Sequence, residues 1–243
     1  MTVRYERSGP VAVVTIDRFE RRNSVDRATA VALGEAWRRF DQDGEAAVGI
    51  LTGRGMFSAG ADLKSFDLVD DPAGFLGFTR MTVTKPTIAA IEGHCVAGGL
   101  EMALWCDLRV AGQGAVFGCF ERRFGVPLVD GGTQRLPRLV GLGRALDLIL
   151  TGRAVATDEA VAIGLVNRVV PEGEAIGEAV ALAHQIAAFP QAAVLSDRRA
   201  VYEGLGHSLS VGLEMERELG LPSIAAGAEG ARRFASGLGP GGG

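Results

Sequence analysis

The chain has 243 residues, enough for one large domain, or for one core with a small appended piece, and the buried core needs no disulfide or metal to hold it together. Apolar residues make up 47% of the chain, charged residues make up 22%, and the formal net charge is -4. This balance is typical of a globular protein and argues against nucleic acid as the main partner.

Cysteine content and hydropathy indicate the compartment. Cys95, Cys106 and Cys119 have neither the paired spacing of a zinc site nor the even number expected of a disulfide framework. The first residues lack the apolar segment of a signal peptide, and no apolar run reaches membrane-spanning length. We therefore expect a cytoplasmic protein with no metal site and no membrane contact.

The beginning of the chain predicts a hairpin, a helix and a buried strand. A turn signal at 8–10 and the alternating stretch before it place a β-hairpin around a strand at 11–16. Asp26 can cap a helix whose apolar residues, at three- and four-residue steps, form one stripe as far as Phe40. Residues 48–51 then have the continuous apolar character of a buried strand.

Strand and helix patterns alternate again further along. Residues 87–91 and 108–111 are predicted strands, and residues 100–106 between them are a predicted helix. After about residue 133, helical spacing dominates at 144–150, 158–163, 174–188 and in stretches of 192–219.

These patterns predict an α/β protein with three parts. Residues 1–190 are expected to form the core with the functional site. Residues 191–236 are expected to form a helical region that covers the core or supplies a subunit interface. Residues 237–243 are too glycine-rich to order themselves.

Two glycine-containing loops each follow a predicted strand. The first is residues 57–64, and the second is residues 93–101, with Gly98 and Gly99 where a helix begins. Small residues let a ligand approach the backbone, and unpaired N–H groups at a helix start favour an anion. One N–H from each loop, aimed at one carbonyl oxygen, would make an oxyanion hole. Either loop alone is better explained as a tight strand–helix turn.

Four short motifs follow one another along the chain: Ala59-Gly60-Ala61-Asp62-Leu63, Ala97-Gly98-Gly99-Leu100-Glu101, Phe117-Gly118 before Glu121, and Gly131-Gly132-Thr133-Gln134-Arg135-Leu136-Pro137. In this order and at this spacing they resemble the enoyl-CoA hydratase/isomerase (crotonase) family. A later run, Leu150-Thr151-Gly152-Arg153, is similar to the family's next landmark, and the resemblance extends from about Arg4 to Phe234.

The resemblance implies a fold, a ligand and an assembly. The fold would be a spiral of ββα units with a helical C-terminal region, assembled as a trimer or a dimer of trimers. The ligand would be an acyl-CoA thioester, and no further cofactor is implied.

The resemblance also implies which residues form the site. It assigns the oxyanion-hole amides to Ala61 and Gly98. The residues that it assigns to the CoA site in addition to these two are Ala59, Asp62, Leu63 and Lys64. Arg21 and Arg22 match a segment beside the CoA phosphates, where positive charge suits a polyphosphate, although surface arginines need no ligand to explain them.

Glu101 and Glu121 match the two catalytic glutamates of the family's hydratases. Glu101 lies among apolar neighbours, which favour a neutral carboxyl group, and its alternative role is to complement a helix dipole. The alternative for Glu121 is a surface ion pair with Arg122 or Arg123. In a hydratase the two glutamates would share one water, one taking its proton while the other protonates the α-carbon.

Asp130 is a departure from the hydratase pattern, where a small uncharged residue is usual. An aspartate matches this place in relatives that isomerise dienoyl thioesters, where it transfers protons, and in relatives that displace halide, where it is a nucleophile. Asp130 is equally suited to cap the helix that follows it. Because both glutamates are present, hydration is the first expectation. Double-bond isomerisation is the second, and hydrolysis or dehalogenation through Asp130 follows.

Three other classes fit less well. The glycines near residues 53 and 141 do not complete a G-x-G-x-x-G run, which disfavours a nucleotide-binding enzyme. No G-x-S-x-G segment supports a serine hydrolase. A non-catalytic acyl-CoA-binding protein would have no need of both glutamates.

Overall fold

A computed structural model describes residues 2–237, apart from the side chains of residues 225, 226, 229 and 233. All but the first residue of the expected disordered tail, 237–243, therefore lies outside the described residues. Contacts divide the chain into two compact units, Met1–His184 and Gln185–Gly243. We describe each unit by itself.

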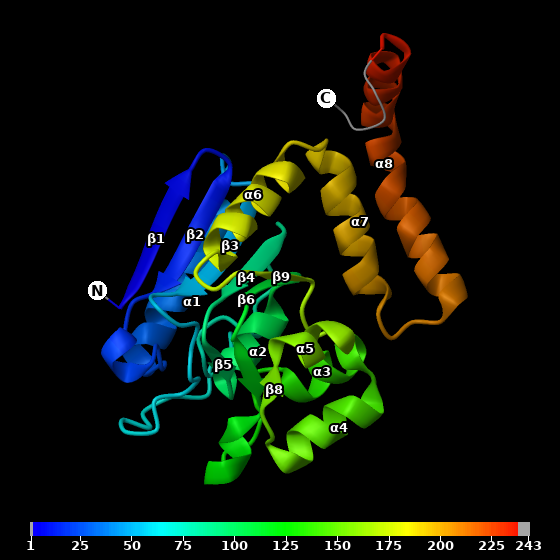
Figure 1. Ribbon diagram of the computed structural model, residues 1–243. Coiled ribbons are helices and arrows are strands. Elements are labelled where there is room, and N and C mark those ends of the chain that lie inside the picture. Colours follow the sequence, from blue (N-terminus) through cyan, green and yellow to red (C-terminus); the bar gives the residue numbers. More distant parts are fainter. Residues whose placement is uncertain (1, 238–243) are drawn as a thin grey trace. The chain divides into compact units, whose positions relative to one another are not determined.

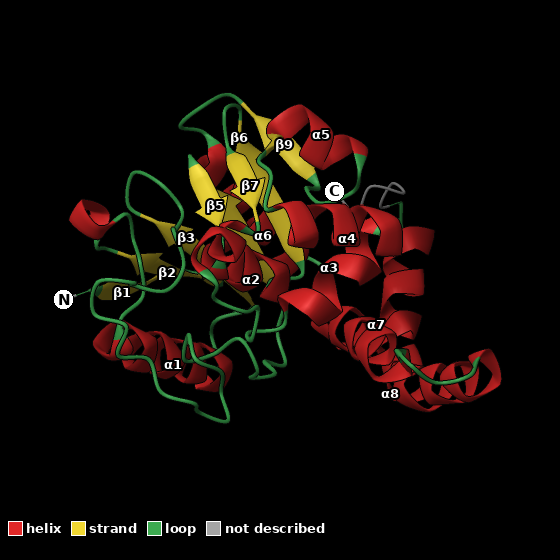
Figure 2. Cartoon of the chain, turned by 90° about the horizontal axis from the view of Figure 1, so that it is seen from below, coloured by secondary structure: helices red, strands yellow, loops and turns green. Residues whose placement is uncertain are grey.

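The first unit begins with the predicted hairpin, helix and strand. Strands β1 (Val3–Ser8) and β2 (Val11–Ile16) pair antiparallel, and β2 pairs parallel with β3 (Val48–Gly53). In the sequence, α1 (Arg27–Gln42) lies between β2 and β3, and it packs against β1 and β2 (Figure 2). The Asp26 carboxylate accepts the Thr29 amide at 2.9 Å, so the predicted N-cap is confirmed.

Two sheets organise the unit. The larger has the order β1-β2-β3-β4-β6-β9, in which only the first pair is antiparallel (Figure 1). The smaller has the order β5-β7-β8. The remaining strands are β4 (Thr87–Ile91), β5 (His94–Val96), β6 (Leu108–Gly112), β7 (Val116–Gly118), β8 (Val155–Ala156) and β9 (Arg168–Val170).

Successive turns of chain contribute one strand to each sheet, which makes the spiral of ββα units. Strand β4 enters the large sheet, β5 enters the small one, and α2 (Gly98–Trp105) follows. Strands β6 and β7 repeat the pattern before η2 (Phe120–Phe124), a short 3-10 helix, and α3 (Gly132–Val140). The other helical elements are η1 (Phe19–Arg21), α4 (Leu142–Thr151), α5 (Thr157–Ala162) and α6 (Ala175–Ala187).

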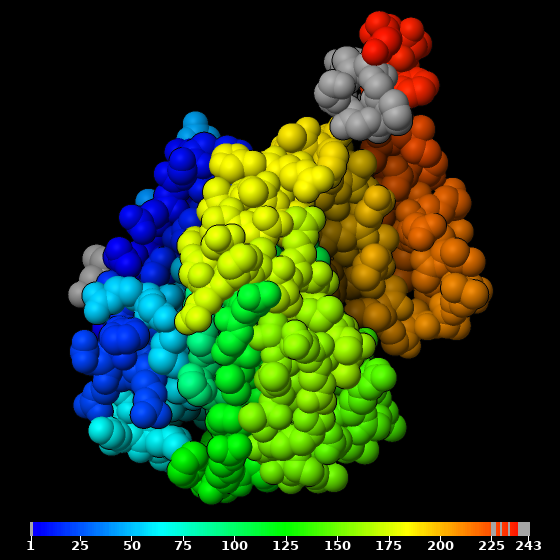
Figure 3. All heavy atoms as spheres, in the orientation of Figure 1, coloured from blue at the N-terminus to red at the C-terminus, as the bar shows by residue number. Residues whose placement is uncertain are grey.

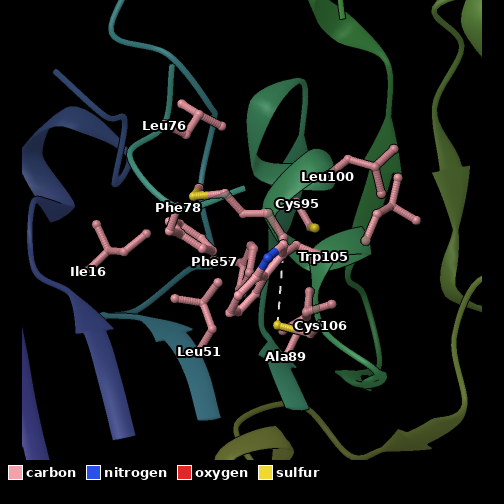
Figure 4. Close-up of a cluster of buried hydrophobic side chains, with 14 of the residues drawn as sticks. Ile16, Leu51, Phe57, Leu76, Phe78, Ala89, Cys95, Leu100, Trp105 and Cys106 are labelled. Carbon is pink, nitrogen blue, oxygen red and sulfur yellow. Dashed lines mark hydrogen bonds between the residues drawn. The ribbon is translucent and has the colours of Figure 1, made fainter. Parts of the chain in front are cut away.

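An aromatic cluster stands between α1, α2 and the segment before β4. Trp37 lies 4.7 Å from Trp105 and 5.7 Å from Phe78 between ring centroids, and Phe78 meets Trp105 edge-on at 4.8 Å. Figure 4 shows Phe57, Phe78 and Trp105 directed into the same interior. This packing holds the two glycine-containing loops on a rigid base.

The space-filling view shows how the beginning and the middle of this unit are separated. The N-terminal hairpin (blue) lies at one edge, while the green to yellow-green segments, roughly residues 110–165, gather on the other side (Figure 3). Among the described residues, no group of three or more His, Cys, Asp or Glu side chains is placed to hold a metal ion.

The second unit is a pair of long helices, α7 (Gln191–Gly204) and α8 (Leu209–Ala235). The Ser223 hydroxyl of α8 donates to the carbonyl of Ala192 in α7 at 2.9 Å. No single helix in residues 2–237 is long and apolar enough to cross a membrane, and only α6 and α7 taken together meet the criterion of length and composition.

Candidate active site

The first glycine loop, residues 57–64, is supported by the chain segment before α1. The Ser58 hydroxyl donates to the carbonyl of Asn23 at 2.8 Å and accepts the Gly60 amide at 3.0 Å. The Val25 amide donates to the Gly60 carbonyl at 2.8 Å. Both the hydroxyl and the backbone of the loop are therefore bonded to the protein, which fixes the loop conformation before any ligand binds.

The second loop ends at a strained residue. Ala97 has φ 53 and ψ -131, a conformation that costs a non-glycine residue on the order of 1–3 kcal/mol. Its amide donates to the carbonyl of Gly118 in β7 at 2.9 Å, which holds the strained turn in place. The next residue, Gly98, is the first of α2, so its amide has no partner within the helix. The strain at Ala97 thus sets the direction of the Gly98 N–H.

The two loops are in contact. A Cβ placed on Gly60 would lie 2.5 Å from the Gly98 nitrogen, and one placed on Gly98 would lie 3.4 Å from the Ala61 nitrogen. Within the described part of the chain, neither the Ala61 amide nor the Gly98 amide donates a hydrogen bond to the protein. Adjacent loops therefore leave two neighbouring N–H donors unpaired, as binding one oxyanion requires.

Glu101 lies one helical turn inside α2 and bonds to a different helix. Its Oε1 accepts the amides of Asp130 (2.9 Å) and Gly132 (2.8 Å), at the start of α3. Burial raises the pKa of Glu101 to about 7, these two hydrogen bonds oppose the rise, and the charges of Asp130 and Glu121 add to it. A carboxyl group of this kind can exchange a proton near neutral pH.

Glu121 lies in η2 and is 6% exposed. Both of its carboxylate oxygens are buried without a hydrogen-bond partner in the described structure. Burial raises the pKa of Glu121. The surface ion pair considered for it is wrong, because Arg122 donates to the carbonyl of Ile149 and Arg123 to that of Gly152. A buried carboxylate with two unpaired oxygens is costly for the fold and suggests a ligand.

Asp130 does not cap α3, so the structure contradicts that prediction. The residue at the cap position is Gly131, with φ 104 and no side-chain cap bond. The Asp130 carboxylate turns instead to a different segment, where it accepts the Leu76 amide at 3.2 Å and the Thr79 hydroxyl. The Glu101 carboxylate takes the place of a cap, because it accepts the Gly132 amide in the first turn of α3.

The residues expected beside coenzyme A lie around the first loop. Arg21 and Arg22 are exposed on and after η1. Burial opposes ionisation of Asp62, but the hydrogen bond from the Lys64 amide and the charge of Arg18 lower its pKa, and the charge of Arg21 adds to the lowering. The Asp62 side chain has protein partners, since it accepts the Lys64 amide at 3.0 Å and pairs with Arg18 at 3.2 Å. Its role in the described structure is to shape the loop.

The other residues of this group differ in what they offer a ligand. Ala59 is half-buried, and its amide donates to the Arg22 carbonyl at 3.0 Å. Leu63 is 43% exposed and Lys64 is exposed, so both side chains remain accessible.

Several residues that shape the site have only a weak signal in the sequence. Asn23 has φ 51, is fully buried, and donates to the carbonyls of Arg54 and Met56. Asparagine adopts the left-handed conformation more readily than most residues, and only this preference could have indicated a turn at Asn23 from the sequence. Arg18 and Ala97 have no local signal, because their roles depend on partners far along the chain.

Comparisons with known proteins identify the family. The enoyl-CoA hydratase/isomerase family matches residues 6–235. The short-chain-enoyl-CoA hydratase of Clostridium acetobutylicum is 38% identical over 223 residues, which are 88% of this chain and 85% of that protein. The carnitinyl-CoA dehydratase of Salmonella agona is 39% identical over 189 residues, 74% of this chain and 72% of that protein.

Solved structures give the same answer for the fold. The crystal structure of an enoyl-CoA hydratase from Mycobacterium marinum aligns with a TM-score of 0.92 at 38% identity, covering 97% of this chain and 96% of that one. An enoyl-CoA hydratase from Mycobacterium tuberculosis H37Rv aligns with a TM-score of 0.92 at 36% identity and the same coverage. The predicted fold and family are thus confirmed, and the chain belongs to the enoyl-CoA hydratase/isomerase family.

Proposed function

We propose that the protein adds water across the double bond of a 2-enoyl-CoA thioester. The proposal rests on the surroundings of Glu121. Its carboxylate is buried and both of its oxygens are unpaired in the described structure, and its charge raises the pKa of the neighbouring Glu101. A water molecule held between the two carboxyl groups would give Glu121 a partner and would use the free Oε2 of Glu101. The names of the hydratase and dehydratase relatives support the same reaction class.

The unpaired amides of Ala61 and Gly98 would bind the thioester oxygen. As water attacks, negative charge moves onto this oxygen and an enolate forms. Two N–H donors aimed at that charge stabilise the transition state more than the ground state. The strained backbone at Ala97 and the supported first loop keep both donors in place without a ligand, so little reorganisation is needed during the reaction.

The two glutamates would handle the protons. One carboxylate accepts a proton from the water as its oxygen bonds to the β-carbon, and the other carboxyl group delivers a proton to the α-carbon. The net change is one O–H bond broken, one C–O bond and one C–H bond formed, and the π bond lost. Because both hydrogen bonds of Glu101 use Oε1, its Oε2 remains for the water. The reaction is neither an oxidation nor a reduction, so coenzyme A would enter only as part of the substrate.

We also propose where the rest of the ligand binds and how the protein assembles. Exposed Arg21, Arg22 and Lys64 around the first loop would offer positive charge to the CoA phosphates. The exposed apolar residues of α7 and α8 support a homo-oligomer, as a trimer or a dimer of trimers. Three buried free cysteines suit a reducing cytoplasm.

Replacing Glu121 tests the proposal. The variant Glu121→Gln keeps the shape of the side chain but removes its proton-transfer capacity, so hydration should fall by about 10²- to 10⁴-fold. The measurement is the loss of conjugated-thioester absorbance with a short 2-enoyl-CoA. Glu45→Gln, at an exposed glutamate, is the control and should behave as wild type.

Two outcomes would count against the proposal. Unchanged hydration by Glu121→Gln would remove this residue from the mechanism. Conversion of a 3-enoyl-CoA by the wild-type protein, with no hydration of any 2-enoyl-CoA, would replace hydration by isomerisation.

A further inference from the structure

The segment 74–80, which leads into the aromatic cluster, is fastened to the turn before α3. The Asp130 carboxylate, 2% exposed, accepts the Leu76 amide and the hydroxyl of the fully buried Thr79, both through Oδ1. The Arg135 guanidinium adds a second link, donating to the Thr79 carbonyl at 2.6 Å and to the Asp130 carbonyl at 2.9 Å. Both the side chain and the backbone carbonyl of Asp130 thus help to hold segment 74–80 against the turn before α3.

This connection reaches the proposed oxyanion site from one side. A Cβ placed on Gly98 would lie 3.0 Å from a methyl carbon of Leu76, so this leucine stands directly beside Gly98. Leu76 is 1% exposed, and Figure 4 shows it close to Phe78 above the buried cluster. The position of segment 74–80 therefore determines how much space lies next to Gly98.

The other end of the connection is Glu101. Its Oε1 accepts the Asp130 amide, so one residue joins segment 74–80 through its side chain and Glu101 through its backbone. No substrate atom fits between the carboxylate and the segment, because a Cβ on Gly74 would already lie 2.7 Å from Oδ1 of Asp130. The aspartate oxygen is thus enclosed by the groups it holds.

On the side that faces α1, segment 74–80 also lines a groove. Gly74, Phe75 and Gly77 line this groove together with residues of α1 and Leu68, and its volume is about 280 Å³. The segment is a partition between the groove and Gly98. At Gly77 its backbone touches α1, because a Cβ on Gly77 would lie 1.9 Å from the Ala30 carbonyl oxygen.

We propose that Asp130 is a positioning residue: by holding segment 74–80 beside Gly98, it limits the length of the acyl group that the site accepts. This inference depends on the proposed function, since it concerns the acyl side of the same site. Asp130 then acts through Leu76 and takes no part in proton transfer or nucleophilic attack. To hold segment 74–80, the position requires an oxygen that accepts two hydrogen bonds, not a negative charge or a titratable proton.

The experiment compares Asp130→Asn with Asp130→Ala. Asparagine keeps an acceptor oxygen for Leu76 and Thr79, whereas alanine removes it. For Asp130→Ala we expect KM for a short 2-enoyl-CoA to rise about tenfold and the preference for long over short acyl chains to grow by a similar factor. The inhibition constant of free CoA for Asp130→Ala should stay within about twofold of wild type. For Asp130→Asn, the KM, the chain-length preference and the inhibition constant of free CoA should each stay within about threefold of wild type.

A second measurement is independent of turnover. Hydrogen–deuterium exchange should show faster exchange of amides 74–80 in Asp130→Ala and near wild-type exchange in Asp130→Asn. Thr79→Val removes the hydroxyl partner while leaving Asp130 in place, so it should show a weaker form of the alanine phenotype. This variant also keeps the inference testable if Asp130→Ala fails to fold.

The outcomes separate this inference from the proposed function. A loss of kcat by orders of magnitude in Asp130→Asn, equal to that in Asp130→Ala with unchanged chain-length preference, would overturn the positioning role in favour of a chemical one. Unaltered exchange of amides 74–80 in Asp130→Ala would also overturn it. Absence of hydration in wild type would overturn the proposed function instead, and the exchange data would still report on the connection.

Discussion

Glu101 and Glu121 are both buried, yet their surroundings differ in one decisive respect. Glu101 accepts two backbone amides through Oε1, while the oxygens of Glu121 have no partner in the described structure. Hydrogen bonds to a carboxylate favour its charged form, and burial disfavours it. The pKa of Glu101 is nevertheless raised to about 7, so burial and the neighbouring carboxylates outweigh the two hydrogen bonds.

The raised pKa of Glu101 predicts how stability depends on pH. The folded protein holds this proton more tightly than the unfolded chain does, so the contribution is fully present below pH 4.5 and is lost as pH rises through about 7. The loss from this group is about 3 kcal/mol, at about 1.4 kcal/mol per pKa unit.

The variant Glu101→Gln isolates this contribution, because glutamine keeps the oxygen that accepts the two amides but does not titrate. Relative to wild type, Glu101→Gln should gain stability between pH 5 and pH 8. Urea unfolding of both proteins at the two pH values measures the change. A difference that is constant with pH would show that Glu101 has an ordinary pKa.

At the scale of elements, the position of segment 74–80 depends on close contact with α1. A Cβ on Gly34 of α1 would lie 2.6 Å from the Gly77 carbonyl oxygen, and one on Gly77 would lie 1.9 Å from the Ala30 carbonyl oxygen. The backbones of helix and segment therefore touch where both residues are glycine. Asp130 holds the segment on one side and α1 limits it on the other.

This contact predicts opposite effects for two glycine-to-alanine changes in helices. Gly177→Ala in α6 meets no atom within 4 Å, so the higher helix propensity of alanine should stabilise the protein by about 0.5–1 kcal/mol. Gly34→Ala gains the same propensity but must displace the Gly77 carbonyl, and strain of this kind costs about 1–3 kcal/mol. We expect Gly34→Ala to lower Tm and Gly177→Ala to raise it. Equal stabilisation by both changes would show that segment 74–80 yields without cost.

At the scale of the whole molecule, the second unit leaves much apolar surface uncovered. None of the described residues of α7 is buried. Along α8, Leu209 is 79% exposed, Leu213 53% and Ile224 67%. Several exposed leucine and isoleucine side chains along one helix are typical of an interface between protein chains.

Charges placed on this surface should therefore disrupt assembly. Wild type is expected to have a mass about three or six times the chain mass of 25.4 kDa in light scattering coupled to gel filtration. The double variant Leu213→Glu, Ile224→Glu should approach the mass of a single chain. Glu216→Gln, a change on the same helix that adds no charge, should leave the mass unchanged. A monomeric wild type would contradict the proposed assembly.

Local pattern was sufficient for elements that are long enough to show a periodicity, an apolar run or a cap in the sequence. The N-cap at Asp26, the apolar stripe of α1 and the strands around 48–51 and 87–91 were predicted, because periodicity and capping act over a few residues. The motifs were sufficient for the family, and they named the two glutamates and the two loops.

Tertiary structure alone decided how the named residues are used. The three-residue strands β5, β7 and β9 were not predicted, because strands this short have no periodicity and exist through pairing with distant partners. Asp130 is a good helix cap by local rules, yet its carboxylate bonds to Leu76 and Thr79, more than fifty residues away in sequence. The amino-acid pattern determines which groups are available, and the long-range packing of the chain determines which of them meet, because burial and hydrogen bonding depend on neighbours that only the fold brings together.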